Sequence, residues 1–167
     1  DLRKGTIITS PNLKNWKNVP IVQMIKKACN MPIYMDNDAN LAAIAEHWIG
    51  AGEGFNNLIM LTLGTGIGGG IIINGQIYRG SHGTAGEIGH MTIIEKGEQC
   101  ACGNYGCLEA YASANATLKR ALNELKMNKT SSLKKFDPKE LNTKDIYIHA
   151  KEGDTFSKKI LQDSGRY

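Results

Sequence analysis

Apolar and polar positions alternate along this chain with two different periods, so the pattern predicts both strands and helices. Apolar runs bounded by Gly, Pro or Asn predict strands at 5–13, 32–36, 57–64, 66–75 and 87–94. Apolar residues three or four positions apart predict helices at 19–30, 41–50 and 108–126, and one or two helices within 136–165. A turn at 10–12 and the hairpin-type pair Asn74-Gly75 separate some of these elements. The mixture predicts an α/β fold.

The net charge of +4 raises the question of nucleic-acid binding. Between Lys119 and Lys159 there are eleven Lys/Arg and six Asp/Glu residues, so the positive excess lies in this segment. The charges are spaced as on the solvated face of a helix, with Leu118, Leu122 and Leu125 on the opposite side. Nucleic acid is therefore not an expected partner.

With 167 residues, of which 41% are hydrophobic and 22% charged, the chain has the composition of a globular protein with one sizeable core. No apolar run is long enough to span a bilayer, and no secretory signal opens the chain. We therefore expect no membrane contact and a cytoplasmic location. The chain begins without Met, as if inside a domain, so we expect it to be a fragment.

Three of the four cysteines fall within eight positions, at Cys100, Cys102 and Cys107. Cys100 and Cys102 are too close in sequence to bridge each other well, and no signal indicates an oxidising compartment. This clustering favours a metal site over disulfides, although free thiols without a metal are the alternative. The fourth, Cys29, lies on the helix predicted at 19–30 and is expected in the core.

A zinc ion needs a fourth ligand besides these three thiolates, because its protein sites are tetrahedral and use sulfur and imidazole. His90 is the nearest imidazole upstream, and His82 is a more distant competitor in a glycine-rich turn. The predicted set is His90, Cys100, Cys102 and Cys107. Four protein ligands close the coordination sphere, so we expect a structural zinc.

The glycine-rich run Leu63–Gly70 lies between two predicted strands. A dinucleotide fingerprint needs a helix after the loop, and a Walker-type loop needs a Lys that is absent, so neither applies. A hairpin tip with almost no side chains lets backbone N–H groups approach phosphate oxygens, and Thr65 would add a hydroxyl. The alternative is a tight turn without a ligand.

Asn37 and Asp38 open the helix that follows the polar cluster 36–40. A carboxylate there is stabilised by the helix dipole and could accept a proton from a sugar hydroxyl that the neighbouring Asn orients. Simple N-capping is the competing interpretation, since Asn and Asp are preferred caps. Asp36 and Asn40 could also cap, so the cluster holds more polar groups than a cap requires.

Taken in order, these motifs resemble the ROK family, which contains sugar kinases, glucokinases prominent among them, and sugar-responsive repressors. The matching segments are Pro11-Asn12-Leu13 with Trp16, "NDAN" at 37–40, "LGTGIGGG" at 63–70, "GTAGEIGH" at 83–90 and "CACGNYGCLE" at 100–109. The resemblance covers about residues 1–120.

The resemblance implies a partial actin-like (ribonuclease H-like) ATPase fold with a structural zinc knuckle. Residues 1–32 would be a remnant of the small first lobe, and 33–167 most of the large second lobe, with the zinc-binding loop at 88–110. Asp38 matches the catalytic base. The positions that match sugar-binding groups are Asn37, Asp38, Glu87, His90 and Glu109. Gly64, Thr65 and Gly66 match the second phosphate-binding hairpin, and His90, Cys100, Cys102 and Cys107 match the zinc ligands.

The resemblance further implies a kinase that moves the γ-phosphoryl group of ATP, with Mg²⁺, to the 6-hydroxyl of a hexose, with glucose the first choice. The family's N-terminal Asp-x-Gly-Gly-Thr loop and its C-terminal part are absent here, so we expect little activity from this chain alone. Its parent is expected to form a homodimer or a higher homo-oligomer. A sugar-sensing repressor is the alternative. An independent zinc ribbon that binds nucleic acid is disfavoured, because residues 95–109 carry the acidic Glu95, Glu98 and Glu109 and only one basic residue, Lys96.

Overall fold

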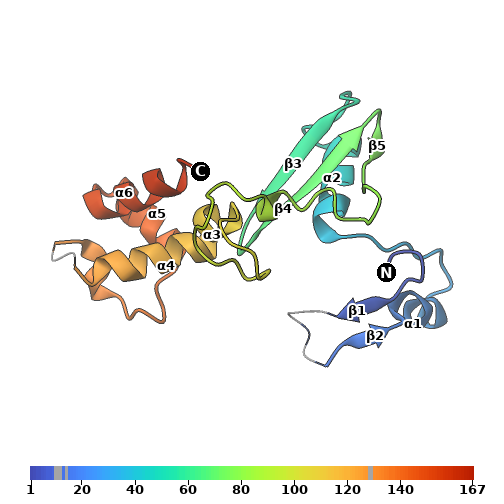
Figure 1. Ribbon diagram of the computed structural model, residues 1–167, viewed down its shortest axis with the longest axis horizontal. Helices are drawn as coiled ribbons and strands as arrows, with labels where there is room; N and C mark the ends of the chain where they lie inside the picture. The colour runs from blue at the N-terminus through green and yellow to red at the C-terminus, as the bar shows by residue number, and fades with distance from the viewer. Residues whose placement is uncertain (10–12, 14, 128–129) are drawn as a thin grey trace.

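A computed structural model describes residues 1–9, 13, 15–127 and 130–167. The strands are β1 (Ile7–Thr9), β2 (Lys17–Val19), β3 (Leu58–Leu63), β4 (Ile67–Ile73) and β5 (Gln76–Ile77). The α-helices are α1 (Ile21–Ala28), α2 (Asp38–Ile49), α3 (Glu109–Ala112), α4 (Ala114–Leu125), α5 (Thr143–Lys151) and α6 (Thr155–Ser164). Short 3-10 helices span Ile88–His90 and Ser132–Lys135. Figure 1 shows β1, β2 and α1 at one end, the β3–β4–β5 sheet with α2 in the middle, and α3–α6 at the other end.

The central sheet is antiparallel, with strand order β3-β4-β5. Leu63 pairs with Ile67 at one end of the β3–β4 hairpin, which leaves the three residues 64–66 as its tip. Asn74 and Gly75 have φ angles of 51° and 74° in the turn to β5, which confirms the hairpin that this pair predicts. The polar cluster 36–40 leads into α2, and α2 packs on β3 and β4. This cluster and the glycine-rich run therefore lie on neighbouring elements.

The glycines of β4 let α2 lie directly on the strand. A Cβ added at Gly68 would sit 3.0 Å from the Ala39 Cβ, and one added at Gly70 would overlap the Ala43 side chain. Ala39 and Ala43 are themselves buried at 5% and 0% exposure. Small residues on both elements thus bring the start of α2 close to the strand that follows the hairpin tip.

We expect Gly70→Ala to lower the free energy of unfolding by about 1–3 kcal/mol, because the new methyl group overpacks the α2–β4 contact. Urea unfolding followed by circular dichroism measures this loss. Gly165→Ala is the matched control, since its nearest neighbour would be the Leu161 carbonyl oxygen at an ordinary 3.6 Å. Equal stability of the two variants would mean that α2 does not rest on β4 in this way.

The second half of the chain forms a helical layer with its own core. That core consists of Ala121, Leu133, Leu141, Ile146, Phe156 and Ile160. The helical region predicted at 108–126 is interrupted at Ser113, whose side chain accepts a hydrogen bond from Ala116 N and begins α4. The region 136–165 holds two helices, as expected. None of the helices in the described ranges combines the length and apolar character needed to cross a membrane.

Some local predictions were wrong. Residues 32–36 form no strand, because no described strand lies beside them and Tyr34 is 91% exposed. The segment 87–94 forms a 3-10 helix and one isolated bridge, from Thr92 to Cys107, in place of a strand. β2 was not predicted, and the turn expected at 10–12 lies outside the described residues. Cys29, expected in the core, is exposed.

Candidate functional site

Asn37 and Asp38 have different hydrogen-bonding roles at the start of α2. Asn37 is the N-cap, and its Oδ1 accepts hydrogen bonds from Ala39 N at 2.9 Å and Asn40 N at 3.1 Å. Asp38 is the first helical residue, and its Oδ1 accepts from Ala39 N at 2.8 Å. Its second carboxylate oxygen has no hydrogen-bond partner in the described part of the chain, and the residue is exposed. Asn37 therefore supplies the cap, and a carboxylate oxygen of Asp38 stays available.

The hairpin tip presents free backbone donors. Gly64 N donates to Gly66 O at 3.0 Å, which closes the tip, and Gly64 O accepts from Ala114 N at 2.9 Å, which attaches the tip to the start of α4. The N–H groups of Thr65 and Gly66 donate to no acceptor among the described residues. Free N–H groups at a side-chain-poor tip form a suitable binding site for anionic oxygens.

Glu109 links this tip to the cysteine cluster. Its Oε2 accepts a hydrogen bond from Ile67 N at 2.8 Å, and its Oε1 lies 3.9 Å from Cys100 Sγ. A Cβ at Gly66 would overlap Oε2, so a side chain at position 66 would displace this carboxylate. The half-buried Glu109 carboxylate thus closes the base of the hairpin from the side of the cluster.

The four predicted metal ligands come together. The ligand atoms of His90, Cys100, Cys102 and Cys107 all lie within 4.8 Å of one another. His82 is not in this group; its Nδ1 instead lies 2.9 Å from Ser81 Oγ. Residues from the 3-10 helix 88–90 and from the loop 100–107 therefore form a single candidate metal centre.

The distances within this centre fit a tetrahedral zinc ion. Zn–S bonds of about 2.3 Å and Zn–N bonds of about 2.05 Å would separate two sulfurs by about 3.8 Å and a sulfur from a nitrogen by about 3.6 Å. Cys102 Sγ and Cys107 Sγ lie 3.8 Å apart, and Cys100 Sγ lies 3.6 Å from His90 Nδ1. The other ring nitrogen, His90 Nε2, lies 3.9 Å from the Glu87 carboxylate. Metal-bound histidines commonly contact a carboxylate through the nitrogen that does not bind the metal.

The thiols of the centre differ in their protonation behaviour. Burial raises the pKa of the Cys107 thiol to about 12. The backbone of Asn104 donates a hydrogen bond that lowers the pKa of the exposed Cys102. A bound divalent cation would favour the thiolate form at both positions, so the donor set suits a metal.

One pocket of about 530 Å³ brings the predicted residues together. Its lining includes Asn37, Asp38, Gly64, Thr65, Gly66, Glu87, His90 and Glu109. Gly69, from the glycine-rich run 63–70, also lines it, and so does Thr62, which the sequence did not indicate. A carboxylate at a helix start, free backbone donors and further carboxylates can together hold a polyhydroxylated molecule beside a phosphate chain.

The sequence also missed an ion pair next to this pocket. Arg79 binds the Asp36 carboxylate, although the sequence suggested only capping for Asp36 and nothing for Arg79. Only the place of Asp36 within the polar cluster 36–40 could have marked the pair, since Arg79 lies 43 positions away.

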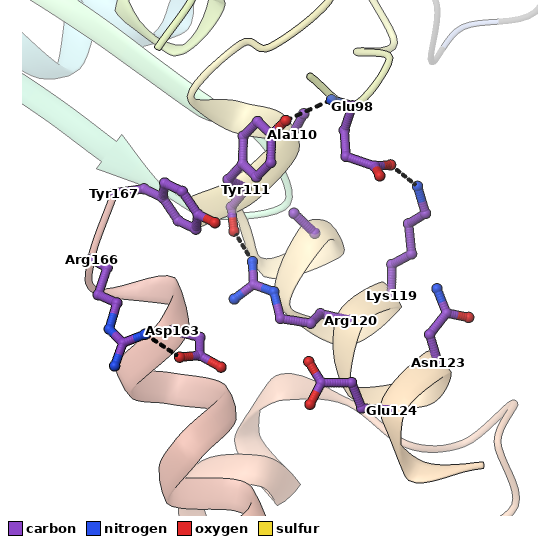
Figure 2. A pocket seen from close by; sticks show the side chains of 11 residues that line it. Glu98, Ala110, Tyr111, Lys119, Arg120, Asn123, Glu124, Asp163, Arg166 and Tyr167 are labelled. Atoms are coloured by element: carbon purple, nitrogen blue, oxygen red, sulfur yellow. Dashed lines mark hydrogen bonds and ion pairs between the residues drawn. The ribbon is translucent and has the colours of Figure 1, made fainter. Parts of the chain in front are cut away.

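A second pocket, between α3, α4 and the end of α6, contains none of the predicted residues (Figure 2). Its three cations are already engaged, through Lys119–Glu98, Arg166–Asp163 and a hydrogen bond from Arg120 to the Tyr111 carbonyl. Tyr111 and Tyr167 pack with ring centroids 4.8 Å apart. These contacts join α6 to α3 and α4 and leave no free cation for an anionic ligand in this pocket.

A Ser-His-Asp cluster in the helical layer is structural. Ser132 Oγ lies 2.6 Å from His149 Nδ1 and 2.8 Å from Asp154 Oδ2, so the carboxylate binds the serine and not the histidine. A catalytic triad needs the carboxylate on the histidine. Asp154 also caps α6 through Ser157 N, at 2.7 Å. Burial alone would raise the pKa of Asp154, but the hydrogen bonds from Ser157 and Ser132 outweigh it and hold the pKa below its ordinary value.

Known proteins resemble the chain over its whole length. It matches the ROK family over residues 1–167. The glucokinase of Halalkalibacterium halodurans is 39% identical over 170 positions, covering 100% of this chain and 51% of that protein. The xylose repressor of Caldicellulosiruptor bescii is 46% identical over 114 positions, covering 68% of this chain and 28% of that protein.

Among solved structures, the ROK family glucokinase from Streptomyces griseus, in complex with glucose and AMPPNP, superimposes with a TM-score of 0.82 at 34% identity. The match covers 98% of this chain and 54% of that one. The chain thus spans about half the length of the full-length glucokinase relative, with 51% of it covered. The α/β fold expected from the sequence is the fold of these sugar kinases. On this evidence of sequence and structure, the chain belongs to the ROK family.

Proposed function

We propose that this chain is part of an ATP-dependent hexose kinase, most similar to bacterial glucokinases. The observation that carries the proposal is the pocket that holds Asp38, the tip Gly64–Gly66 and the carboxylates Glu87 and Glu109 together. The Streptomyces griseus relative, whose structure contains glucose and AMPPNP, supports the same substrate classes.

In the proposed mechanism Asp38 accepts the proton of the sugar 6-hydroxyl as that oxygen attacks the γ-phosphorus of ATP. The bond from the γ-phosphorus to the bridging oxygen breaks, and ADP leaves with the electron pair. The free N–H groups of Thr65 and Gly66 donate to the phosphate oxygens and stabilise their charge. Mg²⁺ on the nucleotide would supply further positive charge. Placement and charge stabilisation account for most of the rate in such transfers.

Asn37, Glu87, His90 and Glu109 bind the remaining sugar hydroxyls in this proposal. Carboxylates discriminate between sugars because a missing or inverted hydroxyl leaves a buried polar group unpaired. The metal centre has a structural role, since its four protein ligands leave no open position for substrate. It holds His90 beside Glu87 and keeps Glu109 against the hairpin.

A sugar-sensing repressor is the second candidate, favoured by the 46% identity to the Caldicellulosiruptor bescii xylose repressor. A sensor needs the sugar-binding groups alone. Two features that a sensor does not need favour the kinase: the free carboxylate oxygen of Asp38 and the unpaired N–H groups at the hairpin tip.

A panel of hexoses, incubated with ATP, Mg²⁺ and the complete protein that carries this chain, tests the proposal. We expect one hexose, with glucose the first choice, to give a mass increase of one phosphoryl group and stoichiometric ADP. N-acetylhexosamines, fructose and allose complete the panel. Sugar binding measured by calorimetry without any phosphorylation would instead support the sensor.

A further inference from the structure

Asp36 directly precedes Asn37 and the candidate base Asp38, and its carboxylate accepts four hydrogen bonds. Its side chain is 5% exposed. Oδ1 accepts from Asn37 N at 2.8 Å and from Asn40 Nδ2 at 3.1 Å. Oδ2 accepts from Arg79 Nε at 2.9 Å and also from Arg79 Nη2. Helix capping explains none of these bonds, because Asn37 already supplies the cap.

Arg79 lies on the chain segment that leads to the other side of the pocket. It follows β5, and its carbonyl oxygen accepts from Ala85 N at 3.2 Å, which closes the loop 79–85. Glu87 N then donates to Thr84 O at 3.2 Å, so this loop leads directly into Glu87 and the 3-10 helix with His90. The Arg79 side chain therefore connects the segment with Glu87 and His90 to the start of α2.

Asp36 is held in its charged form by these partners. Burial alone would raise its pKa, but the hydrogen bonds from Arg79, Asn40 and Asn37 outweigh that effect and lower the pKa below its ordinary value. A buried carboxylate that loses its cationic partner is strongly unfavourable, so its surroundings would rearrange. Asn40 depends on Asp36 as well, since its own Oδ1 is buried without a partner.

We propose that the Asp36–Arg79 ion pair is a positioning device that fixes the distance between Asn37-Asp38 and Glu87-His90 across the pocket. Asp36 orients the α2 start through Asn37 N and the Asn40 amide, and Arg79 orients the loop that ends in Glu87. Neither residue of the pair lines the pocket. In its kinetic form the inference rests on the proposed kinase function.

The test compares Arg79→Met, Asp36→Asn and the double variant in the complete protein. Loss of the pair should raise the KM for the sugar and lower kcat, with a combined fall in kcat/KM of about a hundredfold, because a displacement of about 1 Å has that cost. The KM for ATP should change little. The double variant should be no worse than the poorer single variant, since both remove the same link. Arg79→Lys, which keeps the cation without the two-pronged donor, should recover part of the loss.

Arg166→Met is the matched control, because it breaks another Arg–Asp pair, with Asp163, at the far end of the chain. It should leave both KM values and kcat unchanged. Unchanged sugar KM in Arg79→Met, or fully additive losses in the double variant, would overturn the positioning role.

Amide hydrogen exchange gives a readout that does not need kinase activity. In Arg79→Met, and more weakly in Arg79→Lys, exchange should rise at Asn37, Asn40 and Ala85 and stay unchanged in α5 and α6. A general loss of stability would raise exchange everywhere. If the complete protein is inactive but the variants show this local exchange pattern, the proposed kinase function is refuted and the positioning role of the ion pair stands. If the complete protein is active but the variants lack the pattern, the positioning role is refuted and the kinase function stands.

Discussion

Replacing Asp38 by Asn is expected to lower kcat for sugar phosphorylation by on the order of 10²–10⁴-fold, the usual contribution of a general base. The amide keeps the size of the side chain and its place at the start of α2, but it cannot accept the hydroxyl proton. The sugar KM should therefore change much less than kcat. Initial rates of ADP release over a range of sugar concentrations separate the two parameters.

Stability is the main competing explanation for such a loss. Asp38 lies at the positive end of the α2 dipole, so removing its charge should cost about 0.3–1 kcal/mol, too little to unfold the protein. Asp145→Asn is the matched control, because Asp145 is also an acid in the first turn of a helix and lies outside the pocket. It should lose similar or greater stability and keep its kcat. A wild-type kcat in Asp38→Asn would exclude this residue as the base.

Features that depend on neighbouring residues in the sequence could be predicted well. The Asn74-Gly75 turn, the glycine-rich tip after β3 and the start of α2 each follow from a few adjacent side chains with fixed conformational preferences. The cysteine spacing likewise indicated a metal site that needs a fourth ligand, and the His90 ring lies beside the three cysteine sulfurs. The sequence could not choose between capping and catalysis for Asp38; the structure assigns the cap to Asn37, and the catalytic role remains a proposal.

Features that depend on distant partners could not be predicted. The run 32–36 is apolar enough for a strand, but a strand forms only beside another strand. The run 87–94 alternates like a strand, yet residues 88–90 form a 3-10 helix, in which Gly89 packs on the distant Ile67 carbonyl so closely that a Cβ would not fit. The Asp36–Arg79 pair joins residues 43 positions apart, and no local pattern indicates which acid an arginine will meet.

The Glu109 carboxylate connects the candidate metal centre to the hairpin tip. Glu109 follows Cys107 by two positions, and its Oε2 holds Ile67 N, the first residue of β4. Disorder in the loop that bears the cysteines would release this carboxylate and with it the base of the tip. Loss of the metal should therefore affect the hairpin tip 64–66, the proposed phosphate-binding element, although it contains no metal ligand.

We accordingly expect the complete protein to contain about one zinc per chain and Cys102→Ser to lose it, because a serine hydroxyl is a poor zinc ligand. The apparent free energy of binding at structural zinc sites is on the order of 10 kcal/mol, so the loop 88–110 should lose its order when zinc leaves. Metal analysis by mass spectrometry gives the zinc content. Sugar affinity should fall with it, and amide exchange at Ile67 should rise because Glu109 no longer accepts that N–H.

Cys29→Ser is the matched control, since Cys29 is exposed at the end of α1 and lies outside the cluster. It should keep full zinc, full sugar affinity and a slowly exchanging Ile67 amide. Equal zinc content in the two serine variants would refute the ligand set. Zinc loss with an unchanged Ile67 amide would keep the ligand set and refute the link through Glu109. The two outcomes separate a metal that only orders its own loop from one that also supports the hairpin tip 64–66.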